Sequence, residues 1–253
     1  MTLGILNWGA HSESATIADD NWQRPYLLWE HANKILETNK GAFHLIDAIT
    51  TLKRSVDYRI KDLNEKYKLK RISPHLKKKN TIEKLAEFSV IKPLMLSKLI
   101  EIRNNIEHNE AAPPEHPLCL ELLEFVWYFL RSTDYLCSHI SQSLILNFNN
   151  DFECPYWLSF RPDIVNNWTL NFNGCIKSEW VSKNELTDFF EVQLFEEKTV
   201  ELFLSNLPED ESATFIRKYH SNKSLEDLIV NGVVVDDAAR MKLITKYFEN
   251  GYS

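Results

Sequence analysis

A long run of apolar residues at helical spacing constrains the fold more than any other feature of this sequence. The run extends from Leu45 to Tyr67, and an apolar residue recurs in it at steps of three or four. Its members are Leu45, Ile49, Leu52, Val56, Ile60, Leu63 and Tyr67. Because an α-helix has about 3.6 residues per turn, these residues form one stripe on a single long amphipathic helix. Such a helix must bury its stripe against other elements, which favours a helical bundle.

Helical patterns on both sides of this helix supply the rest of a bundle. Further helices are expected at about residues 25–39, 81–88, 94–108 and 118–146. Pro25 suits a first helical turn, Gly41 breaks the pattern before the long helix, and Pro93 precedes the helix that starts near Leu94. Short connections between four or five helices favour an antiparallel arrangement.

The pattern changes near Asn147, where an asparagine-rich stretch indicates a linker. Beyond it, short β-branched or aromatic segments alternate with polar turns, which predicts strands. The expected strands are at about residues 156–160, 168–172, 176–181, 189–195 and 200–204, followed by helices at about residues 209–220 and 236–250. We therefore predict an α+β fold, mainly α. It has a flexible N-terminus at residues 1–21, an antiparallel helical bundle at residues 22–147, and a small antiparallel β-sheet with C-terminal helices at residues 151–253.

The composition excludes several classes of protein. The chain has 253 residues, of which 44% are hydrophobic and 26% charged, with only 6 glycines and 9 prolines. These values are typical of a globular chain and not of a disordered or collagen-like one. No apolar run approaches the roughly 20 residues of a membrane span, and no secretory signal is recognisable, so we expect a cytoplasmic protein without a membrane partner. The 4 cysteines have no CxxC spacing, which indicates reduced thiols rather than zinc ligands or disulfides.

The net charge of −7 is unevenly distributed along the chain. Residues 66–84 form a basic stretch in which Glu83 is the one acidic residue. Its cations are Lys66, Lys68, Lys70, Arg71, Lys77, Lys78, Lys79 and Lys84. A local basic stretch in an acidic chain suits contact with phosphate groups. The candidate contacts are Lys70, Arg71, Lys77, Lys78 and Lys79. From charge alone, a solvated loop between helices is the simpler interpretation.

The helix expected at residues 94–108 has an arginine within its apolar stripe. The stripe consists of Leu96, Leu99, Ile100 and Ile106. Arg103 falls among them, where a guanidinium loses hydration unless an anion or a facing surface satisfies it. Asn104 and His108 are four residues apart and lie together on the flank of the stripe. Because arginine suits phosphate recognition and histidine exchanges protons near neutral pH, this helix end is a candidate site.

A structural explanation of the same residues stays open. Glu107 follows Arg103 by four residues and can pair with it on the helix surface. The Arg–His spacing also recurs in a longer form at Arg24 and His31, a pair that we regard as accidental. His116 lies among prolines and is expected in an exposed turn. No Gly-rich phosphate loop, HExxH or GxSxG motif is present, and we expect neither a metal nor a cofactor.

The stretch at residues 92–134, KPLMLSKLIEIRNNIEHNEAAPPEHPLCLELLEFVWYFLRSTD, resembles the motif-bearing part of the HEPN ribonuclease superfamily. The signature of that superfamily is an arginine, a polar residue, several further residues and a histidine at the end of a bundle helix. Arg103, Asn104 and His108 match it position by position. The long helix, with LKRSVDYRIKDLNEKY at residues 52–67, also fits the bundle of the superfamily. The resemblance covers about residues 25–146 and none of the C-terminal part.

The resemblance implies a homodimer formed through the bundle, in which two such motifs face each other across a cleft. RNA, such as tRNA or mRNA, would be cut without a metal: the 2′-hydroxyl attacks the adjacent phosphate and leaves a cyclic phosphate and a 5′-hydroxyl. His108 would be the general acid or base, and Arg103 would stabilise charge on the phosphoryl oxygens. Asn104 would orient the histidine or bind phosphate, and Glu107 would support the site. The basic stretch would then guide RNA toward the cleft.

Such proteins often serve as bacterial toxins or anti-phage defence effectors, which implies an antitoxin or a sensor protein as a partner. Two other functions stay open. The first is a non-catalytic bundle that dimerises and binds a nucleotide or a partner protein through the same residues. The second makes the C-terminal domain the main actor, as a regulatory sensor of a protein or small ligand. Its Trp157, Trp168 and Trp180 are more typical of a core than of a ligand platform.

Overall fold

The predicted long helix is present in the computed structural model of the chain as α2, Ala42–Tyr67. Gly41 precedes it in an extended conformation, and Lys68 ends it in a left-handed conformation with a φ of 46°. The residues of the apolar stripe are buried, except Ile60, which is half-buried. The periodicity therefore correctly predicts both the helix and the face that it buries.

The structure describes residues 5, 7–17, 20–38, 41–73, 76, 78–109, 112–148, 156–177, 190–194 and 227–250. The chain divides into two compact units. The helical unit comprises residues 15–140, and the sheet unit comprises residues 1–14 together with residues 141–251. The strand expected at residues 200–204 and the helix expected at residues 209–220 lie outside the described residues.

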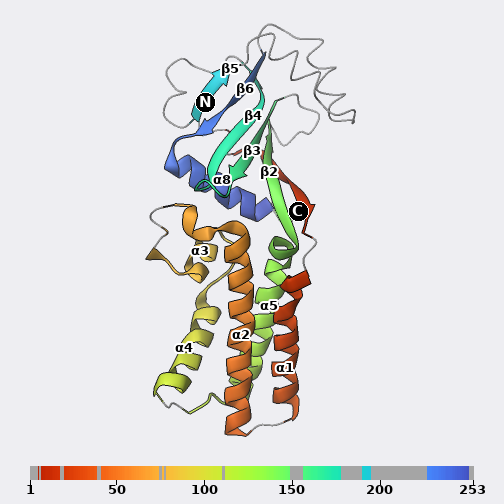
Figure 1. Cartoon of the computed structure of the whole chain (residues 1–253), viewed down its shortest axis with the longest axis vertical. Coiled ribbons are helices and arrows are strands. Elements are labelled where there is room, and N and C mark those ends of the chain that lie inside the picture. Colours follow the sequence, from red (N-terminus) through yellow and green to blue (C-terminus); the bar gives the residue numbers. More distant parts are fainter. Residues whose placement is uncertain are drawn as a thin grey trace. The chain divides into compact units, whose positions relative to one another are not determined.

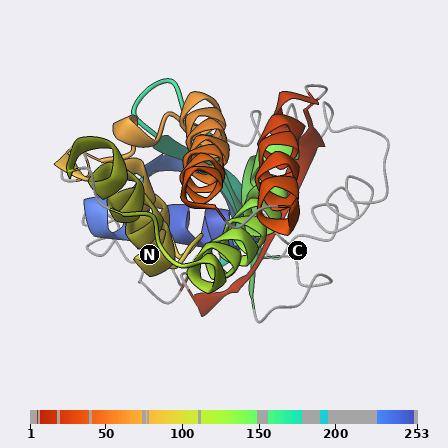
Figure 2. The ribbon, with the colours of Figure 1, turned by 90° about the horizontal axis from the view of Figure 1, so that it is seen from below.

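The helical unit is an antiparallel bundle, as the sequence predicts. With α2, it contains α1 (Arg24–Thr38), α3 (Thr81–Glu87), α4 (Leu94–Asn109) and α5 (His116–Ser138), and the short 3₁₀ turns η2 (Asp20–Gln23) and η3 (Leu69–Arg71). The helices α1, α2 and α5 pack on one another, and α4 packs on α2 and α5 (Figures 1 and 2). Leu36, Leu52 and Leu122 are among the buried side chains that join the first three helices.

The short helix α3 is fixed at its start by reciprocal capping. The side chain of Asn80 accepts a hydrogen bond from the backbone N–H of Glu83 at 2.9 Å, and Glu83 accepts one from the backbone N–H of Asn80 at 2.7 Å. This pair satisfies two of the helix N–H groups that have no partner within the helix. The next residue, Thr81, accepts a hydrogen bond from Asn64 of α2 at 2.7 Å. The start of α3 is therefore held against α2.

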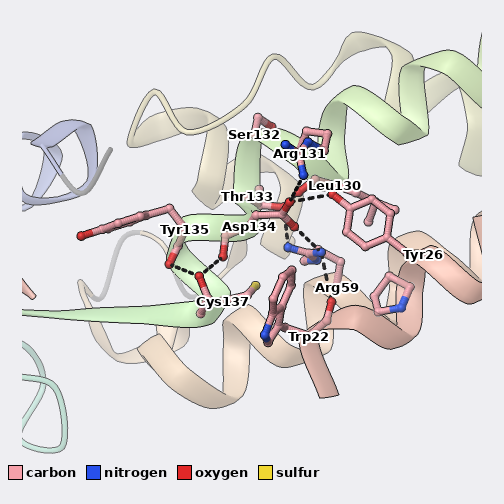
Figure 3. Close-up of polar contacts among 12 residues, drawn as sticks. Trp22, Tyr26, Arg59, Leu130, Arg131, Ser132, Thr133, Asp134, Tyr135 and Cys137 are labelled. Carbon is pink, nitrogen blue, oxygen red and sulfur yellow. Dashed lines mark hydrogen bonds and ion pairs between the residues drawn. The ribbon is translucent and has the colours of Figure 1, made fainter. Parts of the chain in front are cut away.

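A buried arginine connects several elements of the helical unit (Figure 3). Arg59 of α2 is fully buried, and its Nη2 donates to Asp134 of α5 at 2.9 Å and to the carbonyl of Trp22 in η2 at 3.1 Å. The other carboxylate oxygen of Asp134 accepts a hydrogen bond from Tyr26 of α1 at 2.7 Å. Burial and this hydrogen bond raise the pKa of Tyr26 above its usual range, so its hydroxyl stays a neutral donor. One ion pair thus joins η2, α1, α2 and α5.

Six strands form one sheet within the described residues, in the order β1-β2-β3-β4-β6-β5. They are β1 (Gly9–Thr16), β2 (His139–Asn147), β3 (Trp157–Asp163), β4 (Thr169–Lys177), β5 (Phe190–Leu194) and β6 (Asp227–Val234). From β2 onward, neighbouring strands pair antiparallel. The last helix, α8 (Asp237–Glu249), packs Tyr247 and Phe248 on Trp168 of the same unit, with ring centroids 5.5 and 5.6 Å apart. The antiparallel sheet and the final helix are as predicted, and Trp168 belongs to the core.

The N-terminal part differs from the prediction. Residues 1–21 are expected to be irregular, yet Gly9–Thr16 forms β1. Polar side chains link it to β2: Ser143 donates to Glu13 at 2.8 Å, and Asn147 bonds to His11 at 3.1 Å. Because these cross-strand pairs are polar, the strand has no apolar alternation in its sequence, and the pattern does not predict it.

The boundary between the units also differs from the prediction. The helix expected at residues 118–146 ends at Ser138, and β2 begins at His139. Residues of β2 pair with β3, with Leu144 opposite Phe160, and this ladder outweighs the helical pattern of the segment. The strand expected at residues 168–172 and the start of the one expected at residues 176–181 are instead the single strand β4, and β6 is not predicted. Residues 178–181 lie outside the described residues. The helical unit therefore ends at residue 140 rather than 147.

Three cysteines are free and buried: Cys119, Cys137 and Cys175. Burial raises the pKa of Cys119 to about 11, and chiefly burial raises that of Cys137 to about 12. Both thiols are therefore protonated at neutral pH and poorly reactive. Cys154 lies outside the described residues. Among the helices that the structure describes, none is long and apolar enough to cross a membrane.

We expect Asp134→Ala to lower the free energy of unfolding by about 3 kcal/mol, because it leaves the buried guanidinium of Arg59 without its counter-ion. The matched control is Asp57→Ala, which removes the carboxylate of the exposed Lys53–Asp57 pair on α2, 2.5 Å apart. That change should cost less than about 0.5 kcal/mol. Urea unfolding of both variants measures the difference, and equal losses would contradict the role assigned to Arg59.

Candidate functional site

The candidate site lies in the last turns of α4. Leu96 and Leu99 are buried, and Arg103 lies on the same face of the helix. The side chain of Arg103 is 25% exposed, and its Nε is buried without a hydrogen-bond partner in the described part of the chain. Arg103 therefore lies within the apolar stripe, as the sequence predicts. Its guanidinium is partly removed from water, and one of its hydrogen-bond donors has no partner among the described residues.

Two neighbours on α4 hold the outer end of the Arg103 guanidinium. Its Nη2 forms an ion pair with Glu107, one turn further along. Its Nη1 donates to the side-chain oxygen of Asn104 at 3.2 Å. The pairing with Glu107 that the sequence left open is thus present. A helix-surface pair of this kind is worth only a few tenths of a kcal/mol, so an incoming anion can replace it at small cost.

His108 is on the same flank of α4 as Asn104, one turn further along, and its side chain is exposed. Within the residues that the structure describes, its ring makes no hydrogen bond or ion pair. An exposed imidazole is free to meet a ligand, and its ring nitrogens can donate or accept a hydrogen bond there. The structure therefore brings Arg103, Asn104 and Glu107 into contact and leaves His108 apart from them on the adjoining surface.

The basic stretch is less uniform than its sequence indicates. Lys70 and Arg71, in η3, are exposed, and so is Lys78. Lys79 forms an ion pair with Glu87 of α3. Lys77 lies outside the described residues. Of the predicted phosphate contacts, Lys70, Arg71 and Lys78 therefore have the exposure that such a contact needs.

Two other lysines of the basic stretch have structural positions. Lys66 forms an ion pair with Asp62 at 2.7 Å and donates to the carbonyl of Cys137 at 2.6 Å. Lys84, on the inner face of α3, is only 1% exposed. Burial, and then the nearby charge of Lys70, lower the pKa of Lys84. The interpretation of residues 66–84 as one basic surface is therefore wrong for Lys66 and Lys84.

Sequence reasoning missed two residues that position the bundle. Arg59 falls within the apolar stripe of α2, as Arg103 does in α4. This position in the stripe is the sequence signal that could have identified Arg59 as a buried, paired residue. Its partner, Asp134, is 75 residues away in the sequence and gives no local sign of the pairing. His116 is expected in an exposed turn, but it is half-buried at the start of α5 and its Nε2 lies 2.9 Å from the carbonyl oxygen of Leu36.

Comparisons with protein-family models, with curated proteins and with solved structures found no match to this chain. Within the described residues, no group of three or more His, Cys, Asp or Glu side chains is arranged to hold a metal ion.

We expect Lys84→Met to raise the free energy of unfolding at neutral pH, because methionine keeps a long apolar stem and removes a charge that burial and Lys70 disfavour. The pKa of Lys84 is lower in the folded state than its ordinary value of 10.5. The charged form of Lys84 therefore destabilises the folded state to its full extent below the folded-state pKa. This destabilisation disappears as the pH rises toward 10.5. Urea unfolding at several pH values should show the advantage of the variant shrinking in that range.

The control for this measurement is Lys78→Met, at an exposed position of the same stretch. It should change the stability by less than about 0.5 kcal/mol at every pH. A loss of stability in Lys84→Met, or an advantage that does not depend on pH, would contradict the structural assignment of this lysine.

Proposed function

We propose that this protein is an endoribonuclease that cuts RNA without a metal ion, at a site formed by Arg103, Asn104 and His108 of α4. Glu107 supports the site by holding the guanidinium of Arg103 until RNA binds. The substrate class is RNA such as tRNA or mRNA. The observation that carries the proposal is Arg103, a partly buried and incompletely satisfied guanidinium at the helix end that also carries the exposed His108.

In the proposed reaction, the 2′-hydroxyl of one nucleotide attacks the phosphorus that follows it. The bond from the 2′-oxygen to phosphorus forms while the bond from phosphorus to the 5′-oxygen of the next nucleotide breaks. A neutral imidazole of His108 accepts the proton of the 2′-hydroxyl, and an imidazolium donates a proton to the leaving 5′-oxygen. The products are a 2′,3′-cyclic phosphate and a 5′-hydroxyl, which together contain all atoms of the substrate.

Arg103 supplies the electrostatic part of this reaction. Negative charge builds on the phosphoryl oxygens as the phosphorus becomes five-coordinate, and a guanidinium offers two parallel N–H donors to them. The phosphate would take the place of the Glu107 carboxylate. Asn104, which already contacts Arg103, has an amide nitrogen that can bind the phosphate or orient His108.

The two proton transfers favour a homodimer, because two imidazoles can act as base and acid in one event. The proposed dimer contact is the outer face of α5, where aromatic side chains are exposed. Trp127 and Tyr128 are 37% and 62% exposed, and their rings pack edge to face with centroids 5.1 Å apart. The guanidinium carbon of Arg131 lies 5.8 Å from the centroid of the Trp127 ring. Tryptophan, tyrosine and arginine are the residues most enriched at the centres of protein interfaces. We assign the dimer contact of the bundle to this face.

The biological setting of the proposal comes from the resemblance to HEPN ribonucleases. A chain of this kind is proposed to act in the cytoplasm as a toxin or as an anti-phage defence effector. An enzyme that cuts cellular RNA must be restrained until it is needed, so an antitoxin or sensor protein is the proposed partner. The sheet unit is the candidate to receive that regulatory signal.

The test compares wild type, Arg103→Ala and His108→Ala on tRNA and total RNA in the presence of EDTA. Wild type should cut, and each variant should be slower by at least about a hundredfold, because each loses proton transfer or charge stabilisation. His31→Ala is the matched control, since His31 is an exposed helical histidine that belongs to the accidental Arg–His pair. Light scattering on the same preparations should give the mass of two chains.

Equal cleavage by all four proteins would contradict the site. Cleavage that stops in EDTA would contradict the metal-free reaction, and a monomer that cuts RNA would remove the dimer from the proposal. Wild type that binds RNA without cutting it would favour the alternative, a non-catalytic module that binds nucleotides through the same residues.

A further inference from the structure

A hollow of about 620 Å³ opens between α2, α3 and α4 in the helical unit. Residues from all three helices line it, among them Ile60 of α2, Asn80 at the start of α3, and Ser97, Ile100, Glu101 and Asn104 of α4. We call this hollow the α2–α4 groove. It includes one residue of the candidate site, Asn104, and nothing in the proposed reaction explains the rest of it.

The floor of the α2–α4 groove is apolar and incompletely covered. Ile60 is the one member of the α2 stripe that is only half-buried. Ile100 is likewise half-buried, although its neighbours Leu96 and Leu99 on α4 are each 1% exposed. Apolar side chains left partly exposed to one hollow suit the flat face of a nucleobase, which gains from leaving water.

The walls of the groove are polar but unsuited to phosphate. Asn80 lines the groove with an amide nitrogen that has two N–H donors. Such a group matches the acceptor atoms on the edge of an unpaired base. Among the described residues that line the groove, Glu101 is the charged one, and its carboxylate repels a phosphate. A neutral base is therefore accepted in the groove while the charged backbone stays outside it.

A second hollow, of about 490 Å³, adjoins the groove and shares Ile60 with it. Lys68, Lys70 and Arg71 line this second hollow. Its two carboxylates are already paired: Asp57 with Lys53 at 2.5 Å and Glu65 with Lys61 at 3.8 Å. The cations around η3 thus give this end a positive character, which suits the phosphates that flank a bound base.

The wall formed by α4 leads toward the proposed reaction centre. Ser97, Glu101, Asn104 and His108 follow one another at steps of four, three and four residues, so they lie along one side of the helix. Eleven residues of helix span about 17 Å. A strand that starts at η3 and follows the groove beside α4 is therefore directed along that side of the helix toward His108.

We infer that the substrate is single-stranded RNA, with its bases in the α2–α4 groove, its phosphates on Lys68, Lys70 and Arg71, and the strand leading to His108. The inference rests on the proposed function, and it adds the strandedness of the substrate and a binding subsite. Duplex RNA is excluded because its bases are paired and stacked, and the groove accepts only a base that is free to enter it.

The test measures binding in a His108→Ala background, so that RNA is not cut. A labelled single-stranded RNA and a hairpin duplex of the same composition are titrated at one salt concentration. The single strand should bind at least about tenfold more tightly, since a base in contact with the protein contributes about 1–3 kcal/mol. Ser97→Trp fills the groove and should weaken binding of the single strand about tenfold.

Two control variants separate the groove from a general loss of structure. Ser97→Ala keeps the groove open, and Thr38→Trp places the same ring at an exposed helical position on α1. Both should bind as the background protein does, and thermal melting should show all variants folded. Equal binding by Ser97→Trp and Ser97→Ala, or equal affinity for the hairpin and the single strand, would overturn the inference.

The result is distinguishable from a failure of the proposed function. If the groove variants behave as expected but the protein with His108 intact cuts no RNA, the groove binds RNA and the ribonuclease proposal fails. The opposite case uses the Ser97 variants with His108 intact. If the protein cuts RNA, and Ser97→Trp cuts it as fast as Ser97→Ala does, the ribonuclease proposal stands and the groove assignment fails.

Discussion

The buried pair of Arg59 and Asp134 is the interaction on which the helical unit depends. Each charge has lost most of its water, so each is tolerated only because the other is present. The Nη atoms of Arg59 have partners, whereas its buried Nε has none within the described residues. The guanidinium reaches Trp22 as well as Asp134, and the carboxylate also accepts from Tyr26. Four elements must therefore meet in one arrangement, whereas apolar contacts alone would tolerate small shifts between helices.

This arrangement also fixes the surface that faces α4. Ile60 follows Arg59 directly on α2 and turns to another side of the helix, where it forms the floor of the α2–α4 groove. The ion pair holds this segment of α2 from one side and the contact of Asn64 with Thr81 holds the start of α3 beside it. α4 completes the groove with Asn104, and the same helix end carries Arg103 and His108. The proposed binding and reaction steps thus share one supporting helix.

Local periodicity predicts much of the helical unit and of the candidate site. The stripes of α2 and α4, the arginine within the second stripe and its pairing with Glu107 all arise between residues three or four apart, and a sequence displays such spacings directly. The remainder depends on residues far apart in the chain. Asp134 neutralises Arg59 across 75 positions, Lys84 is buried by the packing of α3, and β1 is a strand because of polar partners on β2. Only the folded chain brings these groups together.

In the proposed reaction, the RNA supplies its own nucleophile at the Arg103–His108 site. The most direct measurement uses an RNA whose cleavage position has been mapped and replaces the single 2′-hydroxyl at that position with hydrogen. We expect the modified RNA to bind as before and not to be cut there, while the unmodified RNA yields a 2′,3′-cyclic phosphate. Cleavage of both RNAs at the same position and rate would rule out the proposed reaction, because water would then be the nucleophile.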